Sequence, residues 1–219
     1  MKLTTPLAVL TLTLLPHIAD AKSAADCKAI DAAISANEDF VEVALGIDAL
    51  SPEDALKTIH DTAKTVAPSL GANASRDLQN TLSATDAAFK AGHLPEAAVA
   101  AMENYAVLVK AYDKRLPTTQ DVAMLDYAGF RLLGLLASSP QDWDAMAKTV
   151  AIADASLKST SSRIKDQGLT DLSVTIATGL NESVKAKDAP WLAHAAQVLL
   201  DSVDLMEPKA RNKSPAACR

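Results

Sequence analysis

Hydrophobic residues recur every three or four positions along most of the chain after residue 22, and polar residues fill the positions between them. This spacing places the hydrophobic side chains on one side of an α-helix, whereas a half-buried β-strand would alternate at every second residue. The pattern predicts eight helices, at about residues 24–45, 51–66, 75–91, 95–112, 118–137, 142–164, 170–185 and 190–206.

The predicted boundaries coincide with residues that typically begin or end helices. Ser51-Pro52-Glu53-Asp54 combines an N-cap serine with a proline at the first helical position and acidic residues in the first turn. Ser139-Pro140-Gln141-Asp142 repeats this pattern before the sixth helix. We expect Gly92 to end the third helix and Gly168 to end the sixth, because glycine tolerates the left-handed backbone that often follows a helix.

The connections between the predicted helices are short, which makes consecutive helices antiparallel neighbours. Three turns that open a helix, at 92–97, 139–143 and 188–192, lie about 48 residues apart, and each is preceded and followed by a helix. The sequence therefore predicts an all-α fold of antiparallel helical hairpins, which form either an up-and-down bundle or a short helical solenoid.

One of these turns resembles a known repeat. The segment Ala88-Phe89-Lys90-Ala91-Gly92-His93-Leu94-Pro95-Glu96-Ala97 is similar to the turn between the two helices of a tetratricopeptide repeat. The resemblance covers this one turn, and the spacing of about 48 residues departs from the 34-residue period of that family. It implies a helical hairpin here, and the peptide-binding function of the family is not carried over.

The first 21 residues differ from the rest. Lys2 precedes an apolar run from Leu7 to Leu15, and Ala19-Asp20-Ala21 fits the small-x-small pattern of a signal-peptide cleavage site. The run is too short to cross a bilayer, and Pro16 interrupts it. We therefore predict a signal peptide at 1–21, a helical domain at 22–207 and a basic tail at 208–219. The mature protein is expected in the periplasm or secreted, without a transmembrane segment; bacterial and eukaryotic origins both stay open.

Composition and charge argue against several classes of function. The chain has a formal net charge of −6, which argues against a nucleic-acid partner, because such a surface needs clustered lysine and arginine. Motifs of hydrolases, phosphate-binding loops and haem attachment are absent from the sequence, so we expect no enzyme and no cofactor.

Cys27 and Cys218 are the two cysteines, and they lie near the two ends of the predicted mature chain. An oxidising compartment and an even number of cysteines favour a disulfide bond between them. Two free thiols and an intermolecular bridge are the alternatives.

Asp126 is the most informative single residue, because it interrupts the most apolar stretch of the mature chain, Val122 to Ala137. A buried carboxylate there needs a partner. Arg131 lies about 140° away around the same helix, so the partner should come from another helix, such as Lys110 or a tyrosine hydroxyl. The alternative is that Asp126 lies at a polar edge of its helix. Tyr105 fits the apolar stripe of the fourth helix, and we expect its hydroxyl to reach the surface.

Two functions follow as hypotheses. The first is an exported, non-enzymatic helical protein that acts through contacts with an unidentified periplasmic or extracellular protein. The second is a metal- or small-ligand-binding accessory protein with a site inside the bundle. The candidate ligand residues are His93, Glu96, Glu103, Asp126 and Tyr127.

Overall fold

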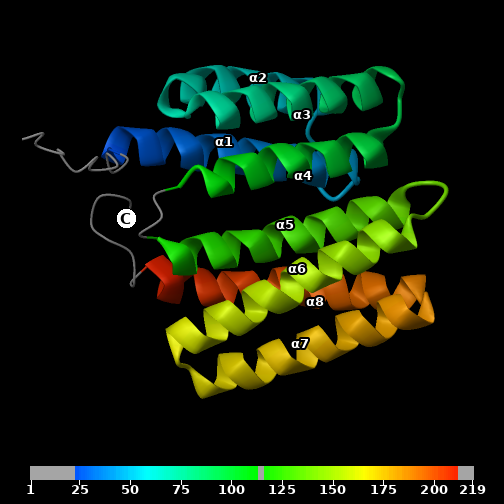
Figure 1. Cartoon of the computed structure of the whole chain (residues 1–219). Coiled ribbons are helices and arrows are strands. Elements are labelled where there is room, and N and C mark those ends of the chain that lie inside the picture. Colours follow the sequence, from blue (N-terminus) through cyan, green and yellow to red (C-terminus); the bar gives the residue numbers. More distant parts are fainter. Residues whose placement is uncertain (1–22, 113–115, 212–219) are drawn as a thin grey trace, which may run out of the picture.

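The computed structural model describes residues 23–112 and 116–211, and within these residues it contains eight α-helices and no strand. This confirms the predicted all-α fold of antiparallel hairpins (Figure 1). The helices are α1 (Ala24–Ala44), α2 (Pro52–Val66), α3 (Ala72–Lys90), α4 (Leu94–Lys110), α5 (Pro117–Ala137), α6 (Trp143–Ile164), α7 (Gln167–Ala186) and α8 (Ala189–Arg211), with a single 3₁₀ turn, Ala67–Ser69, after α2.

The helices form two halves. In the first half, α1 packs against α2 and α4, and α3 packs against α4. In the second, each of α5, α6, α7 and α8 packs against two of the others, so that these four helices form an up-and-down bundle. The halves meet where α4 packs against α5, with a smaller contact between α1 and α5 (Figure 1).

Helix α5 is central, because it packs against α4, α6 and α8 and also touches α1. Two glycines allow two of these neighbours to come close. A Cβ atom at Gly129 would lie 2.5 Å from Leu200 Cδ2 of α8, and one at Gly134 would lie 2.9 Å from Val99 Cγ2 of α4. Larger residues at these positions would push the helices apart.

The core follows the stripes read from the sequence. In α2, for example, Ile59 and Val66 are fully buried and Ala63 is nearly so. Ser51 caps this helix as predicted, and its hydroxyl accepts a hydrogen bond from the Asp54 amide at 3.3 Å. Because each helix buries one face, most of the stabilisation comes from packing between helices.

Two predicted helix boundaries in the second half are wrong. Helix α6 is capped by Asp142 and not by Ser139, since the Asp142 carboxylate accepts a hydrogen bond from the Ala145 amide at 2.9 Å. Gly168 does not end this helix but lies in the first turn of α7. Lys165 takes the left-handed conformation there (φ 58°), and Asp166 caps α7 at once.

Helix α8 extends beyond the expected start of the basic tail and includes Pro208. Proline removes one backbone hydrogen bond of the helix, and Pro208 lies in the last turn of α8. Lys209 forms an ion pair with Asp166, and Ala210 is buried. The last turn is therefore fixed by tertiary contacts.

Several predictions fall partly outside the described residues. The signal peptide at 1–21 and the end of the tail lie outside them. Cys27 is buried in α1, whereas Cys218 lies beyond the last described residue, so the disulfide stays a prediction.

Candidate functional site

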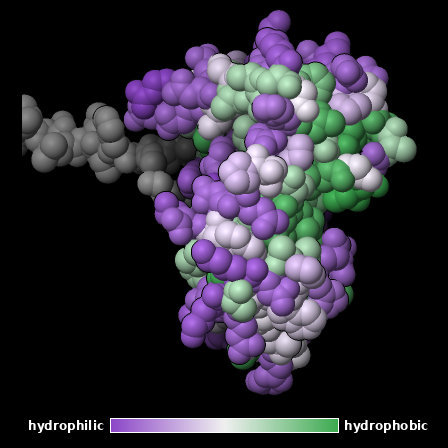
Figure 2. Space-filling model, turned by 90° about the vertical axis from the view of Figure 1, so that its right-hand side faces the viewer, coloured by the Kyte–Doolittle hydropathy of each residue, from purple (hydrophilic) through white to green (hydrophobic). Residues whose placement is uncertain are grey.

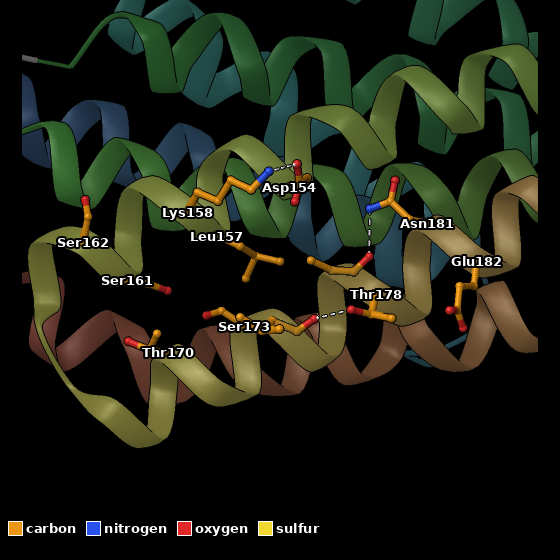
Figure 3. A pocket seen from close by; sticks show the side chains of 12 residues that line it. Asp154, Leu157, Lys158, Ser161, Ser162, Thr170, Ser173, Thr178, Asn181 and Glu182 are labelled. Carbon is orange, nitrogen blue, oxygen red and sulfur yellow. Dashed lines mark hydrogen bonds and ion pairs between the residues drawn. The ribbon is translucent and has the colours of Figure 1, made fainter.

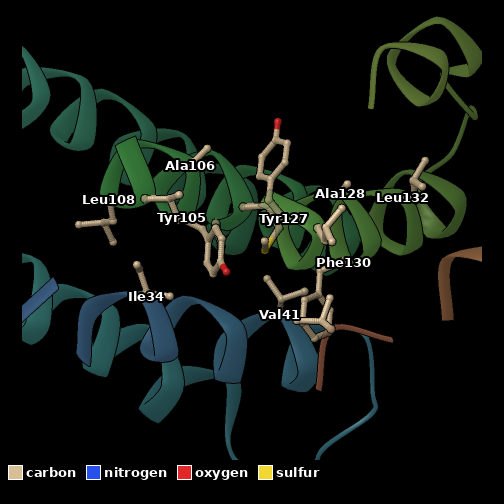
Figure 4. Packing of buried hydrophobic residues seen from close by; sticks show 14 of the residues in the cluster. Ile34, Val41, Tyr105, Ala106, Leu108, Tyr127, Ala128, Phe130 and Leu132 are labelled. Atoms are coloured by element: carbon tan, nitrogen blue, oxygen red, sulfur yellow. The ribbon is translucent and has the colours of Figure 1, made fainter. Parts of the chain in front are cut away.

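Three side chains from three helices meet where the two halves join. Tyr105 of α4 is 1 % exposed, and the carboxyl groups of Glu38 in α1 and Asp126 in α5 lie close enough to influence the pKa of its hydroxyl group. Figure 4 shows the ring of Tyr105 directed from α4 toward α1. The expectation that the hydroxyl group of Tyr105 reaches the surface is wrong, because Tyr105 is buried, whereas the partner expected for Asp126 stays a prediction.

The pKa values of Glu38, Tyr105 and Asp126 are all raised above their ordinary values. Burial is the main reason why the pKa of Asp126 is raised well above its ordinary value, and the negative charges of Glu38, Glu207 and Asp204 raise it further. Burial likewise raises the pKa of Glu38 to about 7, partly opposed by the hydrogen bond from Tyr105. The pKa of Tyr105 is also raised, first by burial and then by the nearby carboxylates. These shifts favour carboxyl groups that hold protons near neutral pH.

Glu38 and Asp126 line a cavity of about 500 Å³ between α1 and α8, whereas Tyr105 and Glu38 line a separate, smaller cavity of about 210 Å³. Both walls of the larger cavity are acidic. The wall from α1 contributes Glu38, Asp39 and Glu42, and the wall from α8 contributes Asp201, Asp204 and Glu207. Among the described residues that line it, Arg211 is the one cation, and its guanidinium lies 3.5 Å from the Glu207 carboxylate.

A second cluster lies on another side of the seam between α4 and α5. Arg131 Nε donates to Glu103 Oε1 at 2.7 Å, and the Tyr127 hydroxyl donates to the same oxygen at 3.2 Å. The guanidinium also contacts the Thr149 hydroxyl of α6 and lies 5.9 Å from the centre of the Tyr127 ring. In Figure 4 the Tyr127 ring points away from α1, opposite to Tyr105.

The five candidate ligand residues do not form one site. Glu103 and Tyr127 meet in the second cluster, whereas Asp126 belongs to the first. His93 is exposed at the start of α4, ten positions before Glu103, which corresponds to roughly 15 Å along the helix. Glu96 lies in the first turn of α4, where an acidic residue favours the helix N-terminus. In residues 23–112 and 116–211, no group of three or more His, Cys, Asp or Glu side chains could hold a metal ion.

Glu38 is the residue that the sequence analysis missed, and Tyr105 was expected to reach the surface although it is buried. A signal for Glu38 exists in the spacing of α1. Its apolar stripe runs through Ile30, Ile34 and Val41, and position 38, four residues after Ile34 and three before Val41, falls on the same face. A carboxylate on an apolar stripe predicts an interior polar contact.

A separate groove lies between α6 and α7, on the far side of the second half (Figure 3). Its volume is about 740 Å³. The lining residues repeat every three or four positions on both helices, so that each helix turns one face to the groove: Asp154, Leu157, Lys158, Ser161 and Ser162 from α6, and Thr170, Ser173, Val174, Ala177, Thr178, Asn181 and Glu182 from α7. Leu157 and Ser161 point from α6 toward α7 in Figure 3.

The groove is apolar and open. Leu157 is buried at its base, while Val174 remains 62 % exposed. Five large hydrophobic side chains of the described residues are more than half exposed. Figure 2 shows apolar residues gathered mainly in the upper part of that face, away from α6 and α7, which lie at the bottom of Figure 1. Val174 is the one of these five that lines the groove.

Comparison of the chain with protein-family models, with curated proteins and with solved structures gave no match. Among the described helices, none combines the length and the apolar character needed to cross a membrane.

Proposed function

We propose that this protein is an exported, non-enzymatic helical protein that binds a partner protein by holding one amphipathic helix of that partner in the α6–α7 groove. The observation that carries this proposal is the apolar groove itself, with Val174 exposed along it. Binding of a helix in a groove between two helices is a common mode of peptide recognition. Export rests on the signal peptide predicted at 1–21.

The dimensions of the groove suit a short helix. From Thr170 to Glu182 the lining residues of α7 span twelve positions, or about 18 Å of helix, which corresponds to about three turns of a bound helix. Small side chains such as Ser173 and Ala177 allow a second backbone to approach closely. We therefore expect the partner to present a narrow apolar stripe.

Charge at the groove further specifies the partner. Asp154 and Lys158 already pair with each other at 2.6 Å. Glu182 at the other end makes no ion pair among the described residues. A lysine or arginine at the matching end of the partner helix would complement Glu182.

A metal or small ligand inside the bundle has less support. Its expected ligands are divided between two clusters and an exposed helix start. In the second cluster the Glu103 carboxylate is already occupied by Arg131 and Tyr127.

Site-specific photocrosslinking tests the proposal. A benzophenone amino acid replaces Val174 in one variant and Leu205 in a control variant, since Leu205 is similarly exposed, at 56 %, but lies outside the groove. We expect one recurrent partner to crosslink at position 174 and not at 205. The peptide attached to position 174 should be an amphipathic helix, and Val174→Glu should weaken its binding at least tenfold, with Leu205→Glu as the matched control. Equal labelling from both positions, or crosslinks only to a second copy of this chain, would overturn the proposal.

A further inference from the structure

One hydroxyl group in the α6–α7 groove differs from the others. Five lining side chains carry a hydroxyl, and four of these donate to a carbonyl of their own helix: Ser162, Thr170, Ser173 and Thr178. The Oγ atom of Ser161 is buried and has no hydrogen-bond partner among the described residues. Ser161 therefore keeps its capacity both to donate and to accept a hydrogen bond.

This hydroxyl is unfavourable where it lies, and it is able to turn. A buried polar group that gains no hydrogen bond loses the energy of its hydration. A serine side chain has three staggered rotamers, so Oγ can swing toward the groove while the helix stays in place. Ser161 as a whole is only partly buried, and it points from α6 toward α7 (Figure 3). Turning Ser161 breaks no hydrogen bond, whereas turning any of the other four side chains breaks one.

We propose that Ser161 selects the partner helix, by forming a hydrogen bond with one uncharged polar side chain that interrupts the apolar stripe of that helix. The inference rests on the proposed function of the groove and specifies its partner. Asn, Gln, Ser and Thr are the side chains that fit, because each can donate and accept. A charged residue at this place would find no free counterion among the described lining residues nearby, since Lys158 already pairs with Asp154 at 2.6 Å.

The place of Ser161 along the groove fixes where this residue lies in the partner. Helix α6 ends at Ile164 and α7 begins at Gln167, so Ser161 and Thr170 lie on opposite sides of the same end of the groove (Figure 3). Glu182 lies near the other end, twelve positions after Thr170, or about 18 Å along α7. The polar residue of the partner should therefore lie about three turns from the basic residue that complements Glu182.

Such a pair of anchors gives specificity. A helix with an uninterrupted apolar stripe would cover Ser161 with carbon atoms and leave its hydroxyl unpaired. A helix that slides by one turn would separate its polar residue from Ser161 and its basic residue from Glu182. Single polar positions set the register of paired helices in coiled coils by the same principle.

A peptide-display selection tests the inference. The probe is a library of amphipathic helical peptides about 18 residues long, in which the stripe positions and both ends are randomised. It is selected for binding to the unsubstituted protein and depleted of peptides that also bind the Val174→Glu variant. We expect Asn, Gln, Ser or Thr to be enriched at one stripe position, with Lys or Arg about three turns away.

Two serine variants separate the hydroxyl group from the rest of the groove. Selected peptides should bind Ser161→Ala about tenfold more weakly than the unsubstituted protein, because a hydrogen bond in a covered site is lost. A fresh selection against Ser161→Ala should lose the polar preference and keep the basic one. Ser162→Ala is the matched control, since Ser162 also lines the groove but donates to the Ser159 carbonyl at 2.7 Å, and it should change neither result.

Failure of this inference is distinct from failure of the proposed function. Peptides whose stripes are wholly apolar, or a polar preference that persists with Ser161→Ala, would overturn the role of Ser161 and leave helix binding in the groove intact. A selection that yields no peptides dependent on Val174 would overturn both.

Thermal unfolding provides a readout without any peptide. Ser161→Ala removes a buried hydroxyl that has no partner among the described residues, so the midpoint of unfolding should rise by about 2–4 °C. Ser162→Ala should raise it less, because a hydrogen bond is lost. A fall in the midpoint for Ser161→Ala would show that its hydroxyl is already paired and would overturn the inference.

Discussion

Two clusters on different sides of the α4–α5 seam use the same residue types in opposite ways. Each places a tyrosine beside carboxyl groups of other helices: the Tyr127 hydroxyl donates to Glu103, and Tyr105 lies close to Glu38 and Asp126. In the first pair Arg131 compensates the negative charge, with Nε 2.7 Å from Glu103 Oε1. In the second, acidic side chains of α1 and α8 surround the carboxyl groups.

The two clusters differ in whether a cation pairs directly with the carboxyl group: Arg131 pairs with Glu103, whereas mainly acidic side chains surround Glu38 and Asp126. Arg131 Nε donates to Glu103 Oε1, and the same guanidinium contacts the Thr149 hydroxyl, so Arg131 links α5 to both α4 and α6. Where the neighbours are acidic, as around Asp126, burial and repulsion favour the protonated carboxyl group. The first cluster is suited to a structural role and the second to a response to pH.

The largest effect is expected from Arg131→Met, which keeps an apolar stem and removes the cation. Arg131 is 17 % exposed, so its loss leaves Glu103 without its charge partner in a partly covered site. We expect the free energy of unfolding to fall by about 2–3 kcal/mol in urea titrations at pH 7. Arg163→Met is the control, because Arg163 is 44 % exposed beside Asp121 and should cost less than about 1 kcal/mol. Equal losses would show that the Glu103 cluster is not structural.

The two tyrosines offer a direct comparison of the clusters. Tyr105→Phe removes a buried hydroxyl group beside Glu38 and Asp126, and we expect a loss of about 1–2 kcal/mol, because a buried polar interaction is removed. Tyr127→Phe leaves Glu103 bonded to Arg131, so the loss should be about 0.5 kcal/mol. Thermal unfolding at pH 6 and pH 8 measures both, and a larger loss from Tyr127→Phe would reverse the assigned roles.

The contribution of Glu38 should make the protein less stable as the pH rises from 5 to 8. The pKa of Glu38 is raised from 4.5 to about 7 on folding, so the folded state holds this proton more tightly than the unfolded state. Its contribution is fully present below 4.5 and is lost as the pH rises through 7. Glu38→Gln should therefore flatten the fall in stability between pH 5 and 8, and gain about 1 kcal/mol over the unsubstituted protein at pH 8.

Glu103→Gln is the control for this titration. It should lower stability at both ends of the pH range, because it leaves Arg131 without its carboxylate. If Glu38→Gln and Glu103→Gln gave parallel pH profiles, the contrast between the clusters would be wrong.

The helices were predictable from the sequence, whereas the assembly of the clusters was not. Helical spacing and caps such as Ser51 act within a few residues, so a single sequence carries them. The burial of Tyr105 was not predictable in this way, because it depends on how α4 rotates against α5, and this rotation is set by packing between helices.

The errors at helix ends have a similar cause. Asp142 replaced Ser139 as the cap of α6, since both residue types cap helices well and local sequence does not rank them. The extension of α8 through Pro208 depends on Lys209 reaching Asp166, forty-three positions earlier in the chain. Contacts of that range are set by the fold, and the spacing of hydrophobic residues does not encode them.

The smallest effect on stability is expected in the groove, which differs from both clusters because its key side chain is exposed. Val174→Glu should change the free energy of unfolding by less than about 0.5 kcal/mol, since Val174 is 62 % exposed and glutamate is a good helix former. Its pH profile should match that of the unsubstituted protein, because the groove is lined by residues of α6 and α7 alone, whereas the acidic cavity is lined by other elements. Chemical unfolding at pH 5 and 8 checks both points. A large loss of stability, or an altered pH profile, would mean that the groove is part of the structural core and not a surface kept open for a partner.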